Sequence, residues 1–184
     1  MPDLSEFSNE DFDRGTGRGR EFLWRLLQPV FFRRTALKWY RTRRWLLRRF
    51  GAEIADGVVV KPGARVTFPW RLVVGKNSWI GEEALLLSLE QIRIGANVCI
   101  SQRAFLCTGS HDWSSPRFDL LTEPIVVEEG AWICANVFVG PGVKIGHNAV
   151  ATAGSVVTQD LPPDMICSGN PCVPVRERHV GSRR

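Results

Sequence analysis

The sequence predicts an all-β solenoid: a parallel β-helix of about five triangular coils, with a helical arm before it and a short tail after it. Three observations lead there. An aliphatic residue recurs every six positions, a small or apolar residue stands two positions before it, and glycine often follows it. This period is neither helical nor the alternation of an antiparallel strand. It fits a short strand followed by a corner, and three such units close one coil.

The repeat occupies residues 52–160, and at its central position fourteen of fifteen residues are Leu, Ile or Val. These inward-pointing positions are Ile54, Val60, Val66, Val74, Ile80, Leu86, Ile94, Ile100, Leu106, Val127, Ile133, Val139, Ile145, Ala151 and Val157. Two-residue insertions follow the first and second coils, and a longer inserted loop, 107–126, follows the third. Strands of a β-sandwich would instead need alternation and regularly spaced turns.

Residues 1–51 form a polar start and a basic, aromatic helical arm, and residues 161–184 form a turn-rich tail. The arm reads as two helical pieces, interrupted at Pro29 and stopped by Gly51. A solenoid exposes unpaired strand edges at both ends unless something covers them. The arm and the tail are the two segments available to do so.

The net charge of +5 is distributed unevenly, because residues 14–50 carry twelve Arg or Lys against one acid, Glu21. Arginine and aromatic side chains on broken helices fit a segment lying at a membrane interface. The same side chains could instead cap the first coil, and these two interpretations stand equal. Contact with nucleic acid is a third, disfavoured because the arm contains no nucleic-acid-binding motif.

Five cysteines without a CxxC pair favour reduced thiols in a cytoplasmic protein over a disulfide framework. The start of the chain is acidic and polar, unlike a secretory signal, and no apolar run is long enough to span a membrane. Zinc ligation by Cys167, Cys172 and His179 would use a spacing that matches no common site.

Several motifs resemble a known superfamily. Rungs such as IGANVC, VGPGVK and IGHNAV, followed by TAGSVVTQDLPP and SGNP, resemble the hexapeptide-repeat acyltransferases. More narrowly, FDRG, FPWRLVVG, VCISQRAFLCTGSHDWSSPRFDL and the closing GNP resemble the sugar O-acetyltransferases of colanic-acid and exopolysaccharide biosynthesis. The resemblance spans about residues 12–176. It implies a left-handed parallel β-helix, a homotrimer with sites shared between neighbours, and acetyl-CoA as co-substrate.

The loop that interrupts the repeat holds His111, and long loops in compact repeats are often functional. Histidine suits a general base near neutral pH, and the resemblance implies that His111 is that base. Asp112 could orient the ring, bind a sugar hydroxyl or simply form a turn, and Trp113 could stack on a sugar or pack against protein. Glu83 and Ser88, one coil earlier, could line the acceptor site or be ordinary surface residues.

In the superfamily coenzyme A lies in the groove between neighbouring prisms, near the last coils. By position, the resemblance implies contacts from Ala135, Ala153, Thr158 and Arg176. The chain departs from the family pattern at Thr152, where glycine is usual, and at Gln159, where lysine is usual. The missing lysine leaves Arg176 or Arg178 to contact phosphate, although both could be solvated tail residues.

The sequence therefore favours a cytoplasmic, acetyl-CoA-dependent O-acetyltransferase acting on an exopolysaccharide precursor, either a sugar or a lipid-linked oligosaccharide. The alternatives are the same chemistry on an antibiotic or an amino sugar, and a non-catalytic β-helix whose basic arm binds nucleic acid. No metal is expected. The zinc carbonic anhydrases that share this fold need a closely spaced histidine pair and a third histidine, an arrangement that this chain lacks.

Overall fold

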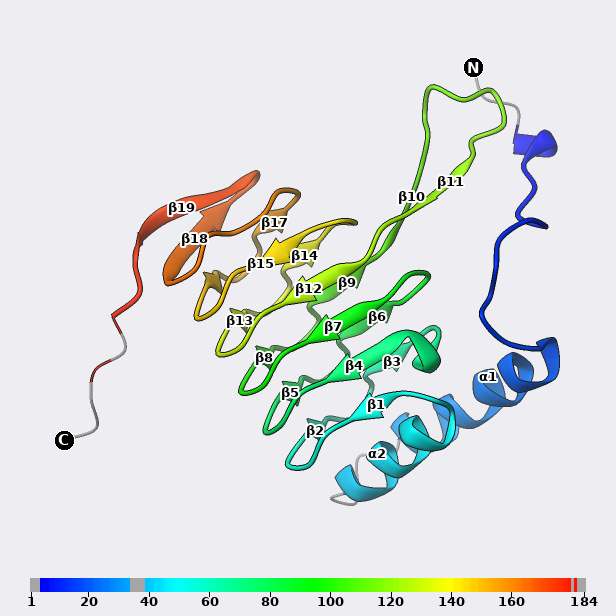
Figure 1. Cartoon of the computed structure of the whole chain (residues 1–184), viewed down its shortest axis with the longest axis horizontal. Coiled ribbons are helices and arrows are strands. Elements are labelled where there is room, and N and C mark those ends of the chain that lie inside the picture. The colour runs from blue at the N-terminus through cyan, green and yellow to red at the C-terminus, as the bar shows by residue number, and fades with distance from the viewer. Residues whose placement is uncertain (1–3, 34–38, 180, 182–184) are drawn as a thin grey trace.

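The computed structural model describes residues 4–33, 39–179 and 181. Its main body is a parallel β-solenoid in which each coil adds one short strand to each of three faces, A, B and C (Figure 1). Face A contains β1 (Glu53–Ile54), β4 (Leu72–Val74), β7 (Ile92–Ile94), β12 (Ile125–Val127) and β15 (Lys144–Ile145). Face B contains β2 (Val59–Val60), β5 (Trp79–Ile80), β8 (Cys99–Ile100), β13 (Trp132–Ile133), β16 (Val150–Ala151), β18 (Met165–Gly169) and β19 (Cys172–Glu177). Face C contains β3 (Arg65–Val66), β6 (Leu85–Leu87), β9 (Phe105–Cys107), β14 (Phe138–Val139) and β17 (Val156–Val157).

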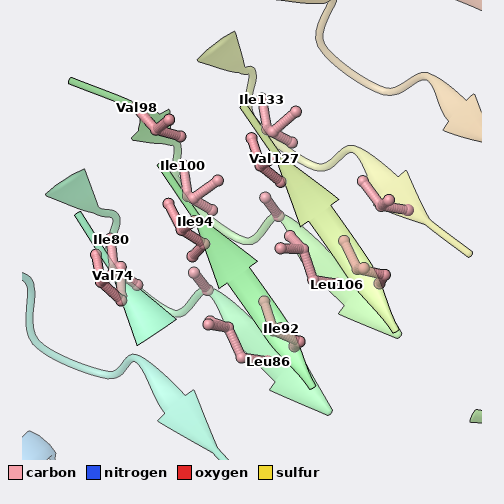
Figure 2. Close-up of a cluster of buried hydrophobic side chains, with 14 of the residues drawn as sticks. Val74, Ile80, Leu86, Ile92, Ile94, Val98, Ile100, Leu106, Val127 and Ile133 are labelled. Atoms are coloured by element: carbon pink, nitrogen blue, oxygen red, sulfur yellow. The ribbon is translucent and has the colours of Figure 1, made fainter. Parts of the chain in front are cut away.

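The interior of the solenoid is built from the repeat. Every aliphatic position that the six-residue period marks is buried, and side chains from successive coils stack on one another along the axis (Figure 2). The predicted five coils are present, and a bridge from Leu161 to Ile145 together with β18 begins a sixth. The solenoid predicted from the period is confirmed.

The arm covers the open edge of the first coil. In a parallel edge strand, alternate residues direct their backbone groups away from the sheet and lack a partner. Here arm side chains donate to those carbonyls: Arg48 to Ile54 (2.7 Å), Arg44 to Val58 (3.1 Å), Arg43 to Val60 (3.1 Å) and Trp24 Nε1 to Val66 (2.8 Å). The Val66 N–H in turn donates to Gln28 Oε1 at 2.6 Å. The arm is therefore a cap.

The helices of the arm are α1 (Arg18–Arg33) and α2 (Tyr40–Arg49). The expected break at Pro29 is wrong, because α1 runs through it; residues 34–38, including Arg34 and Lys38, lie outside the described residues. Proline removes one backbone donor from a helix, which packing can offset. Trp24 and Phe32, buried on either side of the proline, hold α1 against the first coil.

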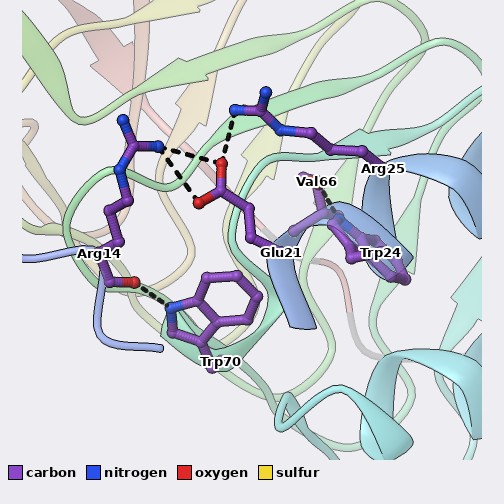
Figure 3. Close-up of polar contacts among 6 residues, drawn as sticks. All are labelled: Arg14, Glu21, Trp24, Arg25, Val66 and Trp70. Atoms are coloured by element: carbon purple, nitrogen blue, oxygen red, sulfur yellow. Dashed lines mark hydrogen bonds and ion pairs between the residues drawn. The ribbon is translucent and has the colours of Figure 1, made fainter. Parts of the chain in front are cut away.

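The segment before α1 is anchored by a buried carboxylate. Glu21, the sole acid in the two helices, lies between Arg14 (3.0 Å) and Arg25 (2.6 Å) (Figure 3). The Arg14 carbonyl accepts a hydrogen bond from Trp70 Nε1 at 2.7 Å. Trp70 belongs to the short helix η2 (Pro69–Arg71) in the first two-residue insertion. The N-terminal segment is thereby tied both to α1 and to the corner between faces C and A.

The tail extends face B beyond the last coil as an antiparallel hairpin of β18 and β19. Cys167 and Cys172 are buried there, and burial raises the pKa of the Cys167 thiol to about 11. Among the described residues, no group of three or more His, Cys, Asp or Glu is placed to hold a metal ion, so the geometry does not support the zinc alternative with His179. In the same part of the chain, no helix is long and apolar enough to cross a bilayer.

The capping bonds make Arg43 a strong test of this architecture, because its side chain is completely buried. Arg43→Leu should lower the free energy of unfolding by about 2–4 kcal/mol, since the Val60 and Phe31 carbonyls would lose a donor while remaining buried. Urea unfolding measures this. Arg93→Leu, at an exposed site on face A, should change stability by less than about 0.5 kcal/mol. Equal effects for the two variants would contradict the capping role.

Candidate active site

The repeat is interrupted between β9, on face C, and β12, on face A. There β10 (Gly109–His111) and β11 (Leu120–Thr122) form an antiparallel hairpin that projects from the coils (Figure 1). The N-terminal segment that follows the short helix η1 (Leu4–Glu6) lies against this hairpin, with the Phe7 ring 5.3 Å from the His111 ring. The inserted loop is thus packed on the beginning of the chain.

Phe118 makes both a hydrogen bond and a stacking contact with the imidazole of His111. Nδ1 lies 2.8 Å from the Phe118 carbonyl oxygen, and the two rings stack with centroids 4.2 Å apart and planes 7° apart. A carbonyl oxygen can only accept a hydrogen bond, so Nδ1 carries the proton. The neutral ring then keeps its lone pair on Nε2. That tautomer is the one suited to accept a proton there.

Phe118 adopts an unusual backbone conformation, with φ at 54°. Bulky L-residues rarely occupy this left-handed region, and such outliers cluster at functional sites where surrounding contacts hold them. Hydrogen bonds from Phe118 N to Ser115 O and from Asp112 N to Asp119 O close the turn around it. Sequence reasoning missed Phe118, because an aromatic residue in a loop carries no sign of its φ angle.

Asp112 shapes the turn after His111. Its Oδ1 accepts hydrogen bonds from the backbone N–H of Ser114 (2.8 Å) and from the Ser114 hydroxyl (2.5 Å). These bonds lower the pKa of the Asp112 carboxyl. Asp112 thus forms a turn, as one of its three considered roles requires, and the His111 ring is oriented by Phe118 instead of by this carboxylate. Trp113 follows in the same turn with 83% of its surface exposed.

A polar cavity of about 440 Å³ lies between the N-terminal segment and the hairpin; Leu120, the strand partner of His111, lines it, whereas His111 itself does not. Its lining comprises the carboxylates of Asp11, Asp13, Glu90 and Asp119, together with Ser8, Asn9, Phe12, Arg71, Leu120 and Thr122. The Arg71 guanidinium lies over the rings of Phe12 and Phe68, and its buried Nη1 has no hydrogen-bond partner among the described residues. Carboxylates beside a guanidinium suit a hydroxyl-rich ligand.

The two other candidate acceptor residues lie elsewhere. Ser88 is completely buried, and its hydroxyl bonds to both the N–H (2.9 Å) and the carbonyl (3.0 Å) of Phe68, which joins two neighbouring coils. Glu83 lies at the corner between faces B and C, ion-paired with Arg103 at 2.7 Å. It lines a separate cavity of about 690 Å³ under α1. Neither residue lines the cavity beside the hairpin.

Two of the candidate coenzyme A residues lie at the corner between faces B and C. Ala135 and Ala153 occupy that corner in adjacent coils, where the Gly154 N–H donates to the Ala135 carbonyl at 2.9 Å. The hairpin carrying His111 leaves from the other edge of face C, so one chain alone does not bring Ala135 and Ala153 to the histidine. Thr158 follows β17, the outermost strand of face C, and therefore lies on the same edge as the hairpin, in a later coil.

The two arginines considered in place of the missing lysine differ in availability. Arg178 donates to the carbonyls of Gly130 (2.9 Å) and Asn148 (2.8 Å), which commits its guanidinium to a corner between faces A and B. Arg176 is exposed on β19. Of the pair, Arg176 is the one with a guanidinium open to a ligand.

Known proteins resemble this chain in sequence and in fold. The chain is 43% identical over 178 residues to an Escherichia coli protein named a colanic acid biosynthesis acetyltransferase, covering 97% of this chain and 98% of that protein. The chain belongs to the hexapeptide-repeat acetyltransferases. Within that family, a Vibrio cholerae acetyltransferase solved with acetyl coenzyme A has a TM-score of 0.78 and 26% identity, covering 98% of this chain and 100% of that one. No family model matches the chain.

Membership of the hexapeptide-repeat acetyltransferases makes this chain an acyltransferase with a left-handed β-helix. A solved galactoside acetyltransferase, at a TM-score of 0.83 and 24% identity, supports the same fold over 97% of this chain and 92% of that one. The curated galactoside O-acetyltransferase of Escherichia coli is 28% identical over 73% of this chain and 68% of its own length.

The turn geometry predicts how Asp112 behaves on substitution. Asp112→Asn should leave the rate of acetyl transfer within about threefold of the unmodified protein, because the asparagine carbonyl can accept the same two hydrogen bonds from Ser114. Asp112→Ala, which removes the acceptor, should slow transfer more. A steady-state acetyl-transfer assay beside a thermal melt measures both variants. A folded Asp112→Asn protein slowed on the order of a hundredfold would instead mean that the carboxylate orients the base.

Proposed function

We propose that this protein transfers acetyl from acetyl-CoA to a hydroxyl of an exopolysaccharide sugar precursor in the cytoplasm, with His111 as general base. One observation carries the proposal: the Nδ1 contact with the Phe118 carbonyl leaves Nε2 of His111 as the proton acceptor, on a hairpin whose Leu120 and Thr122 line a polar cavity. The colanic acid relative supports the pathway, and the related structure with acetyl coenzyme A supports the acetyl donor. All five cysteines are free, as suits a reducing compartment.

The reaction needs a base and positioning. Nε2 of His111 takes the hydroxyl proton as the sugar oxygen attacks the thioester carbonyl carbon. The carbon–sulfur bond then breaks, the acetyl ester stays on the sugar, and the imidazolium returns its proton to the departing thiolate. While the ring is charged, its Nδ1–H bond to the Phe118 carbonyl becomes charge-assisted and stronger. The same contact thus orients the neutral base and stabilises its protonated form.

The cavity beside the hairpin is the proposed acceptor site. Four carboxylates, from Asp11, Asp13, Glu90 and Asp119, favour a neutral sugar rich in hydroxyl groups and disfavour an acidic one at this position. Trp113, exposed on the same hairpin, is available to stack on a sugar ring. The carboxylates would also suit a cationic acceptor, so an amino sugar or an aminoglycoside-like antibiotic is the second candidate. A panel of neutral, acidic and amino sugars, free and carrier-linked, separates them.

The proposed assembly is a homotrimer whose neighbours complete each site. The outward residues of face A are Glu53, Val73, Arg93, Val126 and Lys144, whereas those of face B include Val59, Trp79, Cys99 and Trp132, and those of face C include Leu85, Phe105, Phe138 and Val156. Two apolar faces and one polar face suit a cyclic oligomer, in which each chain presents two different surfaces to its neighbours. A neighbour would also supply the Ala135 and Ala153 corner that His111 does not reach within its own chain.

Loss of the imidazole is the first test. His111→Ala should lower turnover by about 10²–10⁴-fold, the range for a positioned acid–base group. Folding should survive, because the side chain is half-exposed on a hairpin outside the core. Thiol release from acetyl-CoA with a sugar acceptor measures turnover, and a thermal melt checks the fold. A folded His111→Ala protein with near-full turnover would overturn the assignment.

Complementation tests the shared site. His111→Ala and Ala153→Trp, which would block the corner proposed for coenzyme A, should each be nearly inactive alone. Co-expressed, they should regain about a quarter of the unmodified activity, because random assembly pairs an intact histidine with an intact neighbouring corner in that share of the sites. Co-expression of His111→Ala with His111→Asn is the control and should regain none. Without recovery in the first pair, each site would belong to a single chain.

A further inference from the structure

The arm has a second surface that capping does not explain. The face of α1 opposite the first coil exposes four large apolar side chains, those of Phe22, Leu23, Leu26 and Val30, each at least 48% accessible. Trp24 and Phe32 on the other side of the same helix are buried against the coil. α1 is thus apolar on both sides, and the outer side has no partner among the described residues.

α2 extends this outer surface. Trp45 is 60% exposed, although its neighbours Leu46 and Leu47 are buried. Between the helices lies a largely apolar groove of about 470 Å³, lined by Leu23 and Leu27 from α1 and by Trp45 from α2, with Arg20 and Arg49 among its other lining residues. The exposed side chains of both helices therefore form one continuous surface, the arm patch (Phe22, Leu23, Leu26, Val30 and Trp45).

Apart from Glu21, every charged side chain of the two helices is an arginine, and one of them, Arg48, pairs with the exposed carboxylate of Asp56 at 3.0 Å. Arg43, Arg44 and Arg48 turn inward to the first coil. Arg18, Arg41 and Arg49 are exposed, and no carboxylate among the described residues lies within ion-pair distance of them. Arg33 is exposed on the other side of α1, where it lines the cavity between that helix and the coils. Glu21 offers no compensation at the surface, because it is buried between Arg14 and Arg25. The patch is apolar at its centre and cationic around it.

We propose that the arm patch docks on an anionic phospholipid bilayer. An amphipathic helix with bulky apolar residues on one face and arginines beside them lies in a membrane interface, where apolar burial and attraction to anionic headgroups act together. Trp45 adds the aromatic side chain that prefers the headgroup level. The contact is peripheral, because no helix of the described residues is long and apolar enough to span the bilayer.

Two other occupants fit the patch less well. Nucleic acid binding relies on phosphate contacts and on stacking with planar side chains, whereas three of the five patch residues are aliphatic. A second copy of the chain would bring Arg18, Arg41 and Arg49 against their own counterparts, and like charges facing each other oppose association. An anionic bilayer satisfies both the apolar centre and the cationic surround.

Docking here is separate from the proposed chemistry. The arm patch lies at the first-coil end of the solenoid, and none of its residues lines the cavity beside the hairpin (Figure 1). Membrane binding can therefore be lost while acetyl transfer to a soluble acceptor persists, and the reverse. If the acceptor sugar is lipid-linked, the arm patch would hold the enzyme at the surface where that acceptor lies.

Flotation of the full chain with vesicles tests the proposal. The protein should float with vesicles of phosphatidylcholine and phosphatidylglycerol at low salt, and less with phosphatidylcholine alone. Arg41→Gln with Arg49→Gln should weaken partitioning by about thirtyfold, and this loss should shrink at high salt as charges are screened. Leu23→Ser with Leu26→Ser should abolish binding at any salt concentration.

Matched controls lie at distant exposed sites. Val173→Ser with Val175→Ser on β19, and Arg93→Gln on face A, should float like the unmodified protein. All variants should keep the unmodified rate of acetyl transfer to a soluble acceptor. The proposal is overturned if the unmodified protein ignores anionic vesicles, or if the arm variants float as it does. It is equally overturned if the arm substitutions abolish retention on nucleic acid, or a concentration-dependent dimer, while vesicle binding is absent.

Discussion

The open edge of the first coil is the constraint on which the rest of the structure depends. A parallel solenoid satisfies its backbone by stacking coils, and the first coil has no coil before it. Its outward-facing carbonyls need donors, and arginine offers several donors without any acceptor. That explains why basic residues concentrate in the arm and why Arg43 is completely buried there. At the other end β18 lies beside β16, and the Cys167 carbonyl of β18 accepts the N–H of Thr152 from the last full coil.

The β10–β11 hairpin, which carries His111, lies outside the regular coils. Coil positions are fixed by neighbours above and below, but a catalytic base must stand where substrates can approach it. The chain leaves the repeat between faces C and A, and contacts outside the coils position His111: the Phe118 carbonyl, the flanking rings of Phe118 and Phe7, and the turn closed by Asp112. The coils on both sides fix the two ends of the hairpin, which continue into β9 and β12. The regular coils thereby support the short hairpin that carries the proposed base.

The sequence predicted what depends on spacing and missed what depends on backbone angles or tertiary contacts. The six-residue period of the aliphatic residues predicts both the coils and their core, because every side chain at that position has the same buried surroundings. The helix break predicted at Pro29 is wrong, because the helix tolerates the proline once Trp24 and Phe32 are packed. For Ser88 the sequence predicts either a surface position or a contact with the acceptor, yet the residue is buried with its hydroxyl bonded to Phe68. The partner of His111 could not be foreseen, because a backbone carbonyl leaves no trace in the sequence.

In the proposed mechanism, the Phe118 carbonyl fixes the tautomer of His111 so that Nε2 is free to act as the base. Nitrogen-15 NMR of the imidazole side chains, with His111→Ala to assign the signals, reads that tautomer directly in the neutral state. The account predicts a protonated Nδ1 and an unprotonated Nε2, with the Nδ1 proton protected from solvent exchange by its bond to the carbonyl. A neutral His111 that carries its proton on Nε2, or a mixture of both tautomers as in free histidine, would contradict it.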